Sequence, residues 1–326
     1  MSIISRFQAT VDSCCAIHAP DDRTTVFDLN VETDDQLNEI TLLGTVQTKQ
    51  LLENTATALR EATGWTVTTT SVTVLEAESS VRTVDKTAVA VRDSPAESSE
   101  QVTQVLYGAT IQAYDSTDTW TRIRTPDGYI GWIQTDTLSD TTSLAGPAVT
   151  NQAIETDLSI GFIPAGVECE LIAEDGDFSR VRFRTDETAT VSSHAISTQD
   201  GQNDPEAVVD CALEFLETVY EWGGMTNSGI DCSGLAWIAY RTLGVRLPRD
   251  ADQQRYVGTE VSRDELQPGD LLFFPGHVAI SLGRDEYIHA YGGSDSVVTN
   301  SLNPDADAYI ESLDDSFETA RRVISQ

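Results

Sequence analysis

Residues 229–240 constrain the fold of this chain more than any other segment. A glycine-rich turn leads into Asp231-Cys232-Ser233, and six apolar residues, Leu235 to Tyr240, follow directly. A polar turn that runs straight into an apolar segment predicts a buried helix with the cysteine in its first turn. Unpaired N–H groups and the positive dipole end favour a thiolate there and can hold an oxyanion. A buried structural cysteine is the alternative for this residue taken alone.

Two of the four histidines follow the cysteine in strand-like segments. His277 opens the run Gly-His-Val-Ala-Ile-Ser-Leu-Gly, and His289 lies in Glu-Tyr-Ile-His-Ala-Tyr, twelve positions later. This spacing suits antiparallel strands joined at the turn Gly283-Arg284-Asp285. One imidazole can then face the thiol as a base while the other orients it, so the pattern favours nucleophilic catalysis.

The motifs around these residues resemble those of a known family. In order, they are Tyr-x-Trp-Gly-Gly, Ile-Asp-Cys-Ser-Gly-Leu, Leu-Pro-Arg-Asp-Ala-x-Gln-Gln, Pro-Gly-Asp-Leu-Leu-Phe-Phe, Gly-His-Val-Ala-Ile and Tyr-Ile-His-Ala. Residues 203–326 are similar to the NlpC/p60 cysteine peptidases, papain-like enzymes that cleave bacterial cell-wall peptides. The resemblance implies an α+β domain with helices packed on an antiparallel sheet. It implies Cys232 as nucleophile, His277 as general base and His289 as the polar third member.

The net charge of −33 disfavours negatively charged binding partners and indicates a protein that works at high salt. Acidic residues outnumber basic ones 53 to 20, and they are spread along the whole chain. Only Lys49 and Lys86 are lysines. Such a composition is typical of proteins from organisms with molar intracellular salt, where a Debye length of about 3 Å screens self-repulsion. We therefore expect a haloarchaeal-type source and no binding to nucleic acid or anionic membranes.

Other features of the composition indicate a cytoplasmic protein. No run of 18 apolar residues occurs, and the first residues lack a secretory signal pattern. Five cysteines, with Cys14 and Cys15 adjacent, do not form a disulfide framework. The spacing of cysteines and histidines predicts no metal site, and the chemistry implied needs no cofactor.

Residues 1–76 are predicted to form a small α/β domain. Thr25–Val31, Glu39–Val46 and Trp65–Leu75 read as strands, and the apolar period of Lys49–Thr63 predicts an amphipathic helix that ends at Gly64. The order of elements resembles a BON-like domain. A docking or dimerising module is the alternative.

Two small β-barrels are predicted between this domain and the catalytic one. Residues 78–140 resemble a bacterial SH3-like domain, with Val89–Pro95 and a hairpin that ends in Asp-Gly-Tyr-x-Gly-Trp. Residues 141–197 repeat the plan faintly and lack the Gly-Trp signature. A polar stretch, Ser197–Asp204, then links to the catalytic domain.

This arrangement resembles the YkfC-like branch, the γ-D-glutamyl-L-diamino acid endopeptidases. In that branch the first SH3-like domain closes one end of the cleft, which implies short peptide substrates with a free N-terminal L-alanine. A buried ammonium requires a carboxylate and hydrogen-bond acceptors. The resemblance assigns Asp250, Tyr129 and, more weakly, Asp93 to that pocket. A helix cap for Asp250 and barrel core for Tyr129 are the alternatives.

Four further residues near the nucleophile are implied by the resemblance. Asp231 and Ser233 match positions close to the substrate backbone. Tyr220 matches a tyrosine near the oxyanion site, or braces the neighbouring glycine turn. Trp222 lines the cleft wall, or packs under that turn.

The predicted function is cysteine-dependent hydrolysis of the γ-D-glutamyl-L-diamino acid bond through a thioester. Three alternatives stay open: an amidase on another γ-glutamyl substrate, an acyltransferase, and a non-catalytic module that binds wall fragments or partner proteins. Peptidoglycan is not expected in archaea with this composition, so the sequence favours the chemistry and leaves the natural peptide open. It does not predict the oligomeric state.

Overall fold

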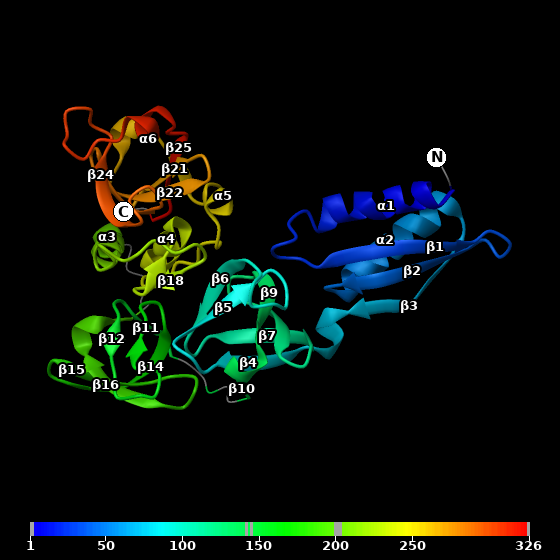
Figure 1. Ribbon diagram of the computed structural model, residues 1–326, viewed down its shortest axis with the longest axis horizontal. Helices are drawn as coiled ribbons and strands as arrows, with labels where there is room; N and C mark the ends of the chain where they lie inside the picture. The colour runs from blue at the N-terminus through cyan, green and yellow to red at the C-terminus, as the bar shows by residue number, and fades with distance from the viewer. Residues whose placement is uncertain (1–2, 141–142, 144–145, 199–203, 325–326) are drawn as a thin grey trace. The chain divides into compact units, whose positions relative to one another are not determined.

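The computed structural model describes residues 3–140, 143, 146–198 and 204–324 (Figure 1). The chain divides into two compact units. The first contains Met1–Val81 and Gln112–Thr135, and the second contains Arg82–Ile111 and Asp136–Gln326. Most of the predicted linker, residues 199–203, lies outside the described residues. In the part of the chain that is described, no helix is long and apolar enough to span a bilayer.

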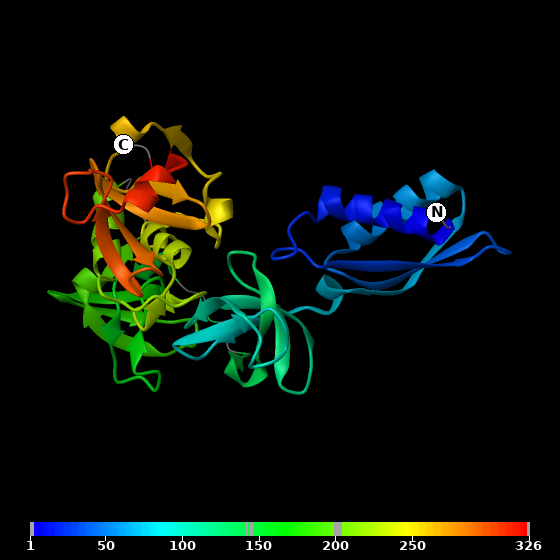
Figure 2. The same ribbon diagram turned by 45° about the horizontal axis from the view of Figure 1, so that its top comes forward.

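A small α/β fold makes up the first part of unit 1. Its elements are α1 (Ile3–His18), β1 (Phe27–Asp34), β2 (Glu39–Val46), α2 (Lys49–Thr63) and β3 (Thr66–Val74). β2 pairs antiparallel with β1 and parallel with β3. Both helices cover one face of this sheet (Figure 2), and the buried apolar residues form a single core between them.

The sequence predicts α2 with the bounds that the structure has. Thr48 caps its first turn by accepting a hydrogen bond from the N–H of Leu51, and Gly64 ends it with φ +71°. Helix α1 is not predicted from the sequence. Its buried Phe7, Val11 and Cys14 recur at helical spacing, but polar residues surround them on a short stripe.

Short strands follow in both units. They are β4 (Ser80–Val84), β5 (Ala88–Arg92), β6 (Gln101–Leu106), β7 (Thr110–Ser116), β8 (Trp120–Arg124), β9 (Ile130–Gln134) and β10 (Leu138–Ser139), with 3-10 turns at Leu75–Glu78 and Thr135–Thr137. In unit 1, β8 pairs antiparallel with β7 and β9. The turn between β8 and β9 contains Gly128 with φ +93°, which explains the glycine of the Asp-Gly-Tyr motif. In unit 2, β5 and β6 form a hairpin.

A second group of strands lies in unit 2. They are β11 (Ala148–Thr150), β12 (Ile154–Glu155), β13 (Phe162–Ile163), β14 (Glu168–Asp175), β15 (Phe178–Arg182), β16 (Thr188–Ser192) and β17 (Ile196–Thr198), with a 3-10 turn at Ser193–Ala195. Five of them form a sheet in the order β16-β15-β14-β11-β17, and β12 pairs with β13. Strand β15 pairs antiparallel with both β14 and β16.

The C-terminal part of unit 2 combines short helices with an antiparallel sheet. Its elements are α3 (Pro205–Leu213), β18 (Met225–Thr226), β19 (Gly229–Ile230), α4 (Cys232–Arg241), α5 (Ala251–Gln254), β20 (Thr259–Val261), a 3-10 turn (Arg263–Glu265), β21 (Leu271–Phe274), β22 (His277–Gly283), β23 (Glu286–Tyr291), β24 (Ser296–Ser301), α6 (Glu311–Asp315) and β25 (Thr319–Arg322). The sheet order is β20-β25-β21-β22-β23-β24.

Helix α4, which begins at Cys232, lies next to α3 and β18 (Figure 1). All ten of its residues are buried, and it packs against β22 and β23. The apolar run that the sequence singles out therefore faces protein on every side, as expected of a helix that is apolar all round. The predicted turn between β22 and β23 is also confirmed, since Gly283 pairs with Glu286.

Candidate active site

The first turn of α4 holds Cys232 in a fixed position. Asp231 caps the helix: its Oδ1 accepts a hydrogen bond of 2.6 Å from the N–H of Gly234. Its Oδ2 accepts one of 2.8 Å from the N–H of Gly223. A Cβ on Gly234 would lie 2.5 Å from the carbonyl oxygen of Gly224. The glycine turn therefore packs directly on the nucleophile's helix, and a side chain at Gly234 would push it away.

The two histidines lie in a hydrogen-bonded line with an asparagine. His277 Nε2 is 2.8 Å from His289 Nδ1, and His289 Nε2 is 2.9 Å from Asn300 Oδ1. β23 and β24 are in register with His289 opposite Val298. Asn300 lies two residues further along β24 and so faces the same side of the sheet.

This line fixes which nitrogen of each ring carries a proton. The amide of Asn300 donates through Nδ2 to the carbonyl of Ala308, at 2.8 Å, so its Oδ1 is the group that faces His289. An oxygen acceptor requires a proton on His289 Nε2, which leaves Nδ1 as an acceptor. His277 then donates from Nε2, and its Nδ1 keeps a free lone pair. Nδ1 is therefore the nitrogen of His277 that can accept a proton.

Burial determines the charge of these groups. Burial, and after it the Asp231 carboxylate, raises the pKa of Cys232 to about 12. Burial also lowers the pKa of His277 to about 3 and that of His289 to about 4. Desolvation thus outweighs the effect of the neighbouring N–H groups on the pKa of this thiol, and the expectation that the helix dipole favours a thiolate stays a prediction. With these pKa values the thiol of Cys232 and both imidazoles are neutral at pH 7.

Several polar groups surround the sulfur of Cys232. The backbone N–H groups of Val278 and Ser233 hydrogen-bond to it and lower its pKa. The pKa of Tyr220 rises to about 12, first through burial and then through the charge of Cys232. The hydroxyl of Tyr220 therefore lies within electrostatic reach of Cys232. These N–H groups have the character of oxyanion donors.

Asp231 and Ser233 are both occupied by protein partners. Arg249 donates to both carboxylate oxygens of Asp231, at 3.0 and 2.7 Å, and to the hydroxyl of Ser233 at 2.8 Å. The side chain of Ser233 also donates to Asp231 Oδ1. The two residues thus hold the turn around Cys232 through bonds within the protein, and their contact with the substrate backbone stays a prediction.

The remaining predicted residues lie on different parts of the chain. Trp222 is 59% exposed, so it does not pack under the glycine turn. Asp250 precedes α5 at the N-cap position, where its side chain makes no capping hydrogen bond. Asp93 is exposed in the β5–β6 turn and accepts a hydrogen bond from the hydroxyl of Ser94. Tyr129 is buried in unit 1.

Asn300 and Arg249 are the residues that sequence reasoning missed. Asn300 has no motif of its own, and only the register of β24 reveals it. Arg249 lies within the Leu-Pro-Arg-Asp motif, but nothing in a sequence says that this arginine is buried. Arginine is almost never fully buried unless it is paired, and its partner Asp231 lies 18 positions away in the sequence.

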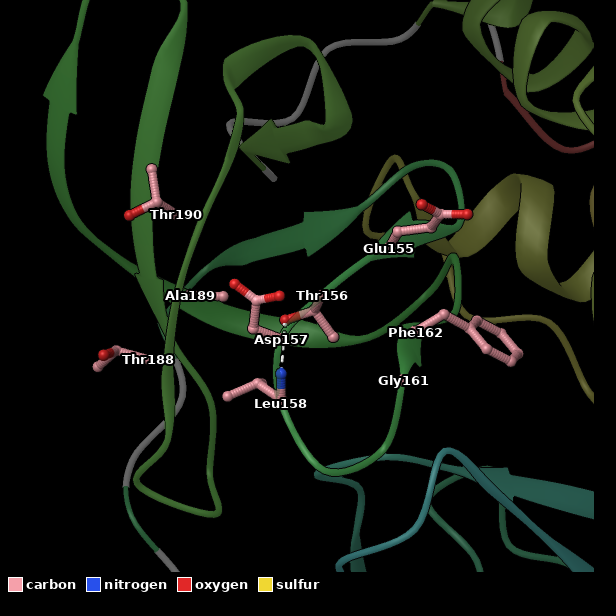
Figure 3. Close-up of a pocket in the computed structure, with 9 residues that line it drawn as sticks. All are labelled: Glu155, Thr156, Asp157, Leu158, Gly161, Phe162, Thr188, Ala189 and Thr190. Carbon is pink, nitrogen blue, oxygen red and sulfur yellow. Dashed lines mark hydrogen bonds between the residues drawn. The ribbon is translucent and has the colours of Figure 1, made fainter.

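Among the described residues, no group of three or more histidine, cysteine, aspartate or glutamate side chains is placed to hold a metal ion. A cavity of about 800 Å³ lies beside β12, β13 and β16, with Glu155, Asp157 and Phe162 in its lining (Figure 3). Its lining lacks a nucleophile with a base, so it is separate from the chemistry at Cys232.

Comparisons with known proteins identify two regions of the chain. Residues 217–310 match the NlpC/P60 family, and residues 87–139 match the bacterial SH3 domain. A crystal structure of an NlpC/P60 family protein from Bacillus cereus superimposes with a TM-score of 0.65 at 20% identity. It covers 76% of this chain and 100% of that one, so the two share a fold beyond the peptidase region.

Curated relatives include peptidases from several bacteria. The chain is 46% identical over 109 residues to dipeptidyl-peptidase 6 of Lysinibacillus sphaericus, which is 33% of this chain and 40% of that protein. It is 26% identical over 214 residues to the gamma-D-glutamyl-L-lysine dipeptidyl-peptidase of Bacillus subtilis, covering 58% of this chain and 71% of that one. It is 33% identical over 156 residues to the murein DD-endopeptidase MepS/murein LD-carboxypeptidase of Escherichia coli K12, covering 43% and 79%. The chain therefore belongs to the NlpC/P60 family and is a cysteine peptidase.

Proposed function

We propose that the protein hydrolyses the γ-D-glutamyl-L-diamino acid bond of short cell-wall peptides through a Cys232-His277-His289 triad. The observation that carries the proposal is the hydrogen-bonded line from His277 through His289 to Asn300, which leaves one imidazole lone pair free. The name of the Bacillus subtilis relative supports the choice of bond. The SH3 match ahead of the peptidase region supports the choice of this branch.

The proposed mechanism uses only groups of this chain and water. His277 takes the thiol proton of Cys232 through Nδ1, and the thiolate attacks the γ-glutamyl carbonyl. The N–H groups of Ser233 and Val278, which already approach the sulfur, stabilise the oxyanion, with Tyr220 beside them. His277 then gives the proton to the leaving amine, and the carbon–nitrogen bond breaks. Water, deprotonated by the same imidazole, hydrolyses the thioester and restores the thiol.

The tautomer of His289 explains why a histidine is suited to the third position. As the thiol proton reaches His277, that ring becomes an imidazolium buried in an apolar site. His289 offers a neutral acceptor to its Nε2–H without adding a charge, and Asn300 holds that acceptor in place. This arrangement is analogous to the orienting member of other nucleophile–base–orienter sites.

Asp250 and Asp93, both in unit 2, are proposed to hold the free N-terminal amine of the peptide. Charge complementarity supports this, because a buried ammonium needs a carboxylate. A role of Tyr129, in unit 1, stays an expectation from the resemblance. Trp222 is proposed as the cleft wall, and its exposed indole supports that role. Asp231 and Ser233 stabilise the turn that holds Cys232. They are proposed to lie next to the substrate backbone when a peptide is bound there.

The other parts of the chain are assigned by proposal as well. Residues 141–197 are proposed as a second SH3-like domain, which the sheet order β16-β15-β14-β11-β17 supports. Residues 1–76 are proposed as a BON-like domain, which the alternation of helices and strands supports. We propose that the enzyme acts in the cytoplasm at high salt, since −33 charges require screening.

The test is hydrolysis of L-Ala-γ-D-Glu-diaminopimelate and of the corresponding L-Lys peptide in molar KCl. The same peptides acetylated at the N-terminal amine serve as controls. We expect cleavage of the free peptides only. Equal cleavage of both forms would keep the triad and reject the amine pocket, whereas no cleavage with a reactive Cys232 would reject this class of substrate.

A further inference from the structure

We propose that Arg249 is a positioning residue that joins the nucleophile turn to strand β6, so that this SH3 strand is part of the catalytic apparatus. The inference depends on the cysteine chemistry of the family and not on which peptide is cleaved. It starts from a buried arginine that the mechanism does not use.

Arg249 forms an almost fully enclosed ion pair with the residue before the nucleophile. Its side chain is 1% exposed, and that of Asp231 is 7% exposed. The pairing is bidentate, the geometry in which guanidinium and carboxylate bind most specifically. A third hydrogen bond reaches Ser233, directly after the cysteine. Arg249 therefore hydrogen-bonds to the residue before Cys232 and to the residue after it.

The remaining nitrogen of this guanidinium is bound by the SH3 strand. Nε of Arg249 donates to the hydroxyl of Thr103 in β6 at 2.8 Å, and Thr103 itself is buried. If the Nε–H of this buried guanidinium loses its acceptor, water cannot replace it, because water does not reach the group. Thr103 thus connects β6, through Arg249, to the turn that contains Asp231, Cys232 and Ser233.

Other residues of β6 hold the neighbouring chain in the same place. Gln101 donates from Nε2 to the carbonyl of Trp222 at 2.9 Å, and Gln104 accepts from the N–H of Met225 at 3.0 Å. A Cβ on Gly223 would lie 3.0 Å from the carbonyl oxygen of Gln101. The strand therefore runs alongside residues 222–225, the turn that packs on the first turn of α4.

The network also sets the electrostatic environment of the thiol. Asp231 before α4 and Arg249 before α5 act on the pKa of Cys232, and the charge of Cys232 acts on Tyr220 before β18. His277 lies on β22 next to Val278, whose N–H approaches the sulfur. Asp231 opposes formation of the thiolate, and Arg249 favours it. Because Arg249 is bound to both carboxylate oxygens of Asp231, its positive charge offsets the effect of that carboxylate on the pKa of Cys232.

The experiment compares Thr103→Val with Thr103→Ser. Valine has nearly the same shape but cannot accept from Arg249, whereas serine keeps the hydroxyl. The first readout is the rate of alkylation of Cys232 by iodoacetamide between pH 7 and 10, which needs no peptide. The second is kcat and KM for the cleaved peptide, and thermal unfolding reports stability.

A matched pair elsewhere in unit 2 provides the control. Arg322 donates to both oxygens of the buried Asp270, at 2.9 and 2.7 Å, with no bond to the turn around Cys232. Arg249→Lys and Arg322→Lys therefore remove the same bidentate geometry at different places.

We expect Thr103→Val to lower kcat and the alkylation rate at pH 9 by fivefold or more while KM changes less than twofold. Thr103→Ser should stay within twofold of the native protein. Arg249→Lys should reduce both rates at least as strongly as Thr103→Val, and Arg322→Lys should lower thermal stability only. The proposal is overturned if Thr103→Val alkylates at the native rate, or if Arg322→Lys slows alkylation equally. Because alkylation is independent of the peptide, this failure is distinct from a failure of the proposed substrate.

Discussion

Asn300 should be essential for catalysis even though it never approaches the substrate-bearing sulfur directly. Its Oδ1 accepts from His289 Nε2 at 2.9 Å and so sets the tautomer that His289 presents to His277. Replacement by alanine leaves a buried N–H without this acceptor. The alternative tautomer would place an N–H of His289 against the N–H of His277. His277 would then have to move its proton to Nδ1, where it blocks removal of the thiol proton.

The magnitude follows from the lost hydrogen bond. Leaving a buried donor unsatisfied costs about 1–3 kcal/mol, and about 1.4 kcal/mol corresponds to a tenfold change in rate. We therefore expect Asn300→Ala to lower kcat/KM by about 5- to 150-fold. The assay is cleavage of L-Ala-γ-D-Glu-diaminopimelate across a pH series in molar KCl.

Asn300→Asp separates the two hydrogen bonds that Asn300 makes. Aspartate loses the donor to the carbonyl of Ala308 but keeps an acceptor for His289. It should therefore retain most of the activity at neutral pH. A carboxylate also stabilises the imidazolium, so the acid limb of the profile should move to higher pH. Asn151→Ala, which removes a 2.9 Å bond to the carbonyl of His194, is the control for a lost asparagine.

The reasoning would be refuted by Asn300→Ala turning over within twofold of the native protein. It would also fail if Asn300→Asp were as slow as Asn300→Ala, because the bond to Ala308 would then be the important one. Asn151→Ala should remain within twofold in every case.

Four further predictions follow from the geometry and the pKa values. The alkylation rate of Cys232 should rise about tenfold per pH unit from pH 7 to 10, since its pKa lies near 12; a plateau near neutral pH would indicate a preformed ion pair instead. His277 and His289 stay neutral when folded down to about pH 3 and 4 but take up protons when unfolded below about 6.5, so each should lower the free energy of unfolding by up to about 1.4 kcal/mol per pH unit as the pH falls through that window. Chemical denaturation of the double His→Gln variant should show a shallower slope, and an unchanged slope would contradict this. Gly234→Ala should destabilise by about 1–3 kcal/mol and reduce kcat, because its Cβ would lie 2.5 Å from a backbone oxygen; native activity and melting temperature would show that the turn moves freely. Trp222→Ala should raise KM with a stability change within about 0.5 kcal/mol, because the side chain is 59% exposed; a large loss of stability with native KM would place it in the core.

The sequence predicts elements well where hydrophobic period and termination signals agree. Lys49–Thr63 has an apolar face, a threonine cap and a terminal glycine, and its bounds are confirmed. Helix α4 and the β22–β23 hairpin are likewise confirmed, because each combines an apolar run with a clear turn. Ile3–His18 escapes this reasoning, since its short apolar stripe is diluted by polar residues and gains stability from packing on the sheet.

Within the site, the sequence predicts which side chains come together better than it predicts how deeply they are buried. His277 and His289 come together as expected from strands that neighbour one another. The charge state of Cys232 is not predictable from its helix position, because burial depends on the surrounding sheet and loops. The role of Asn300 depends on the register of β24 against β23. That of Arg249 depends on a contact with Thr103, 146 residues away in the sequence. Neither produces a local sequence pattern.

The central claim is that Cys232 carries the acyl group during turnover. The most direct measurement is mass spectrometry of the protein quenched in acid while it cleaves L-Ala-γ-D-Glu-diaminopimelate, beside Cys232→Ala. We predict an L-Ala-γ-D-glutamyl thioester on the peptide that contains Cys232, sensitive to hydroxylamine, and no turnover by the variant. Turnover by Cys232→Ala, with no adduct on the native protein, would contradict the account.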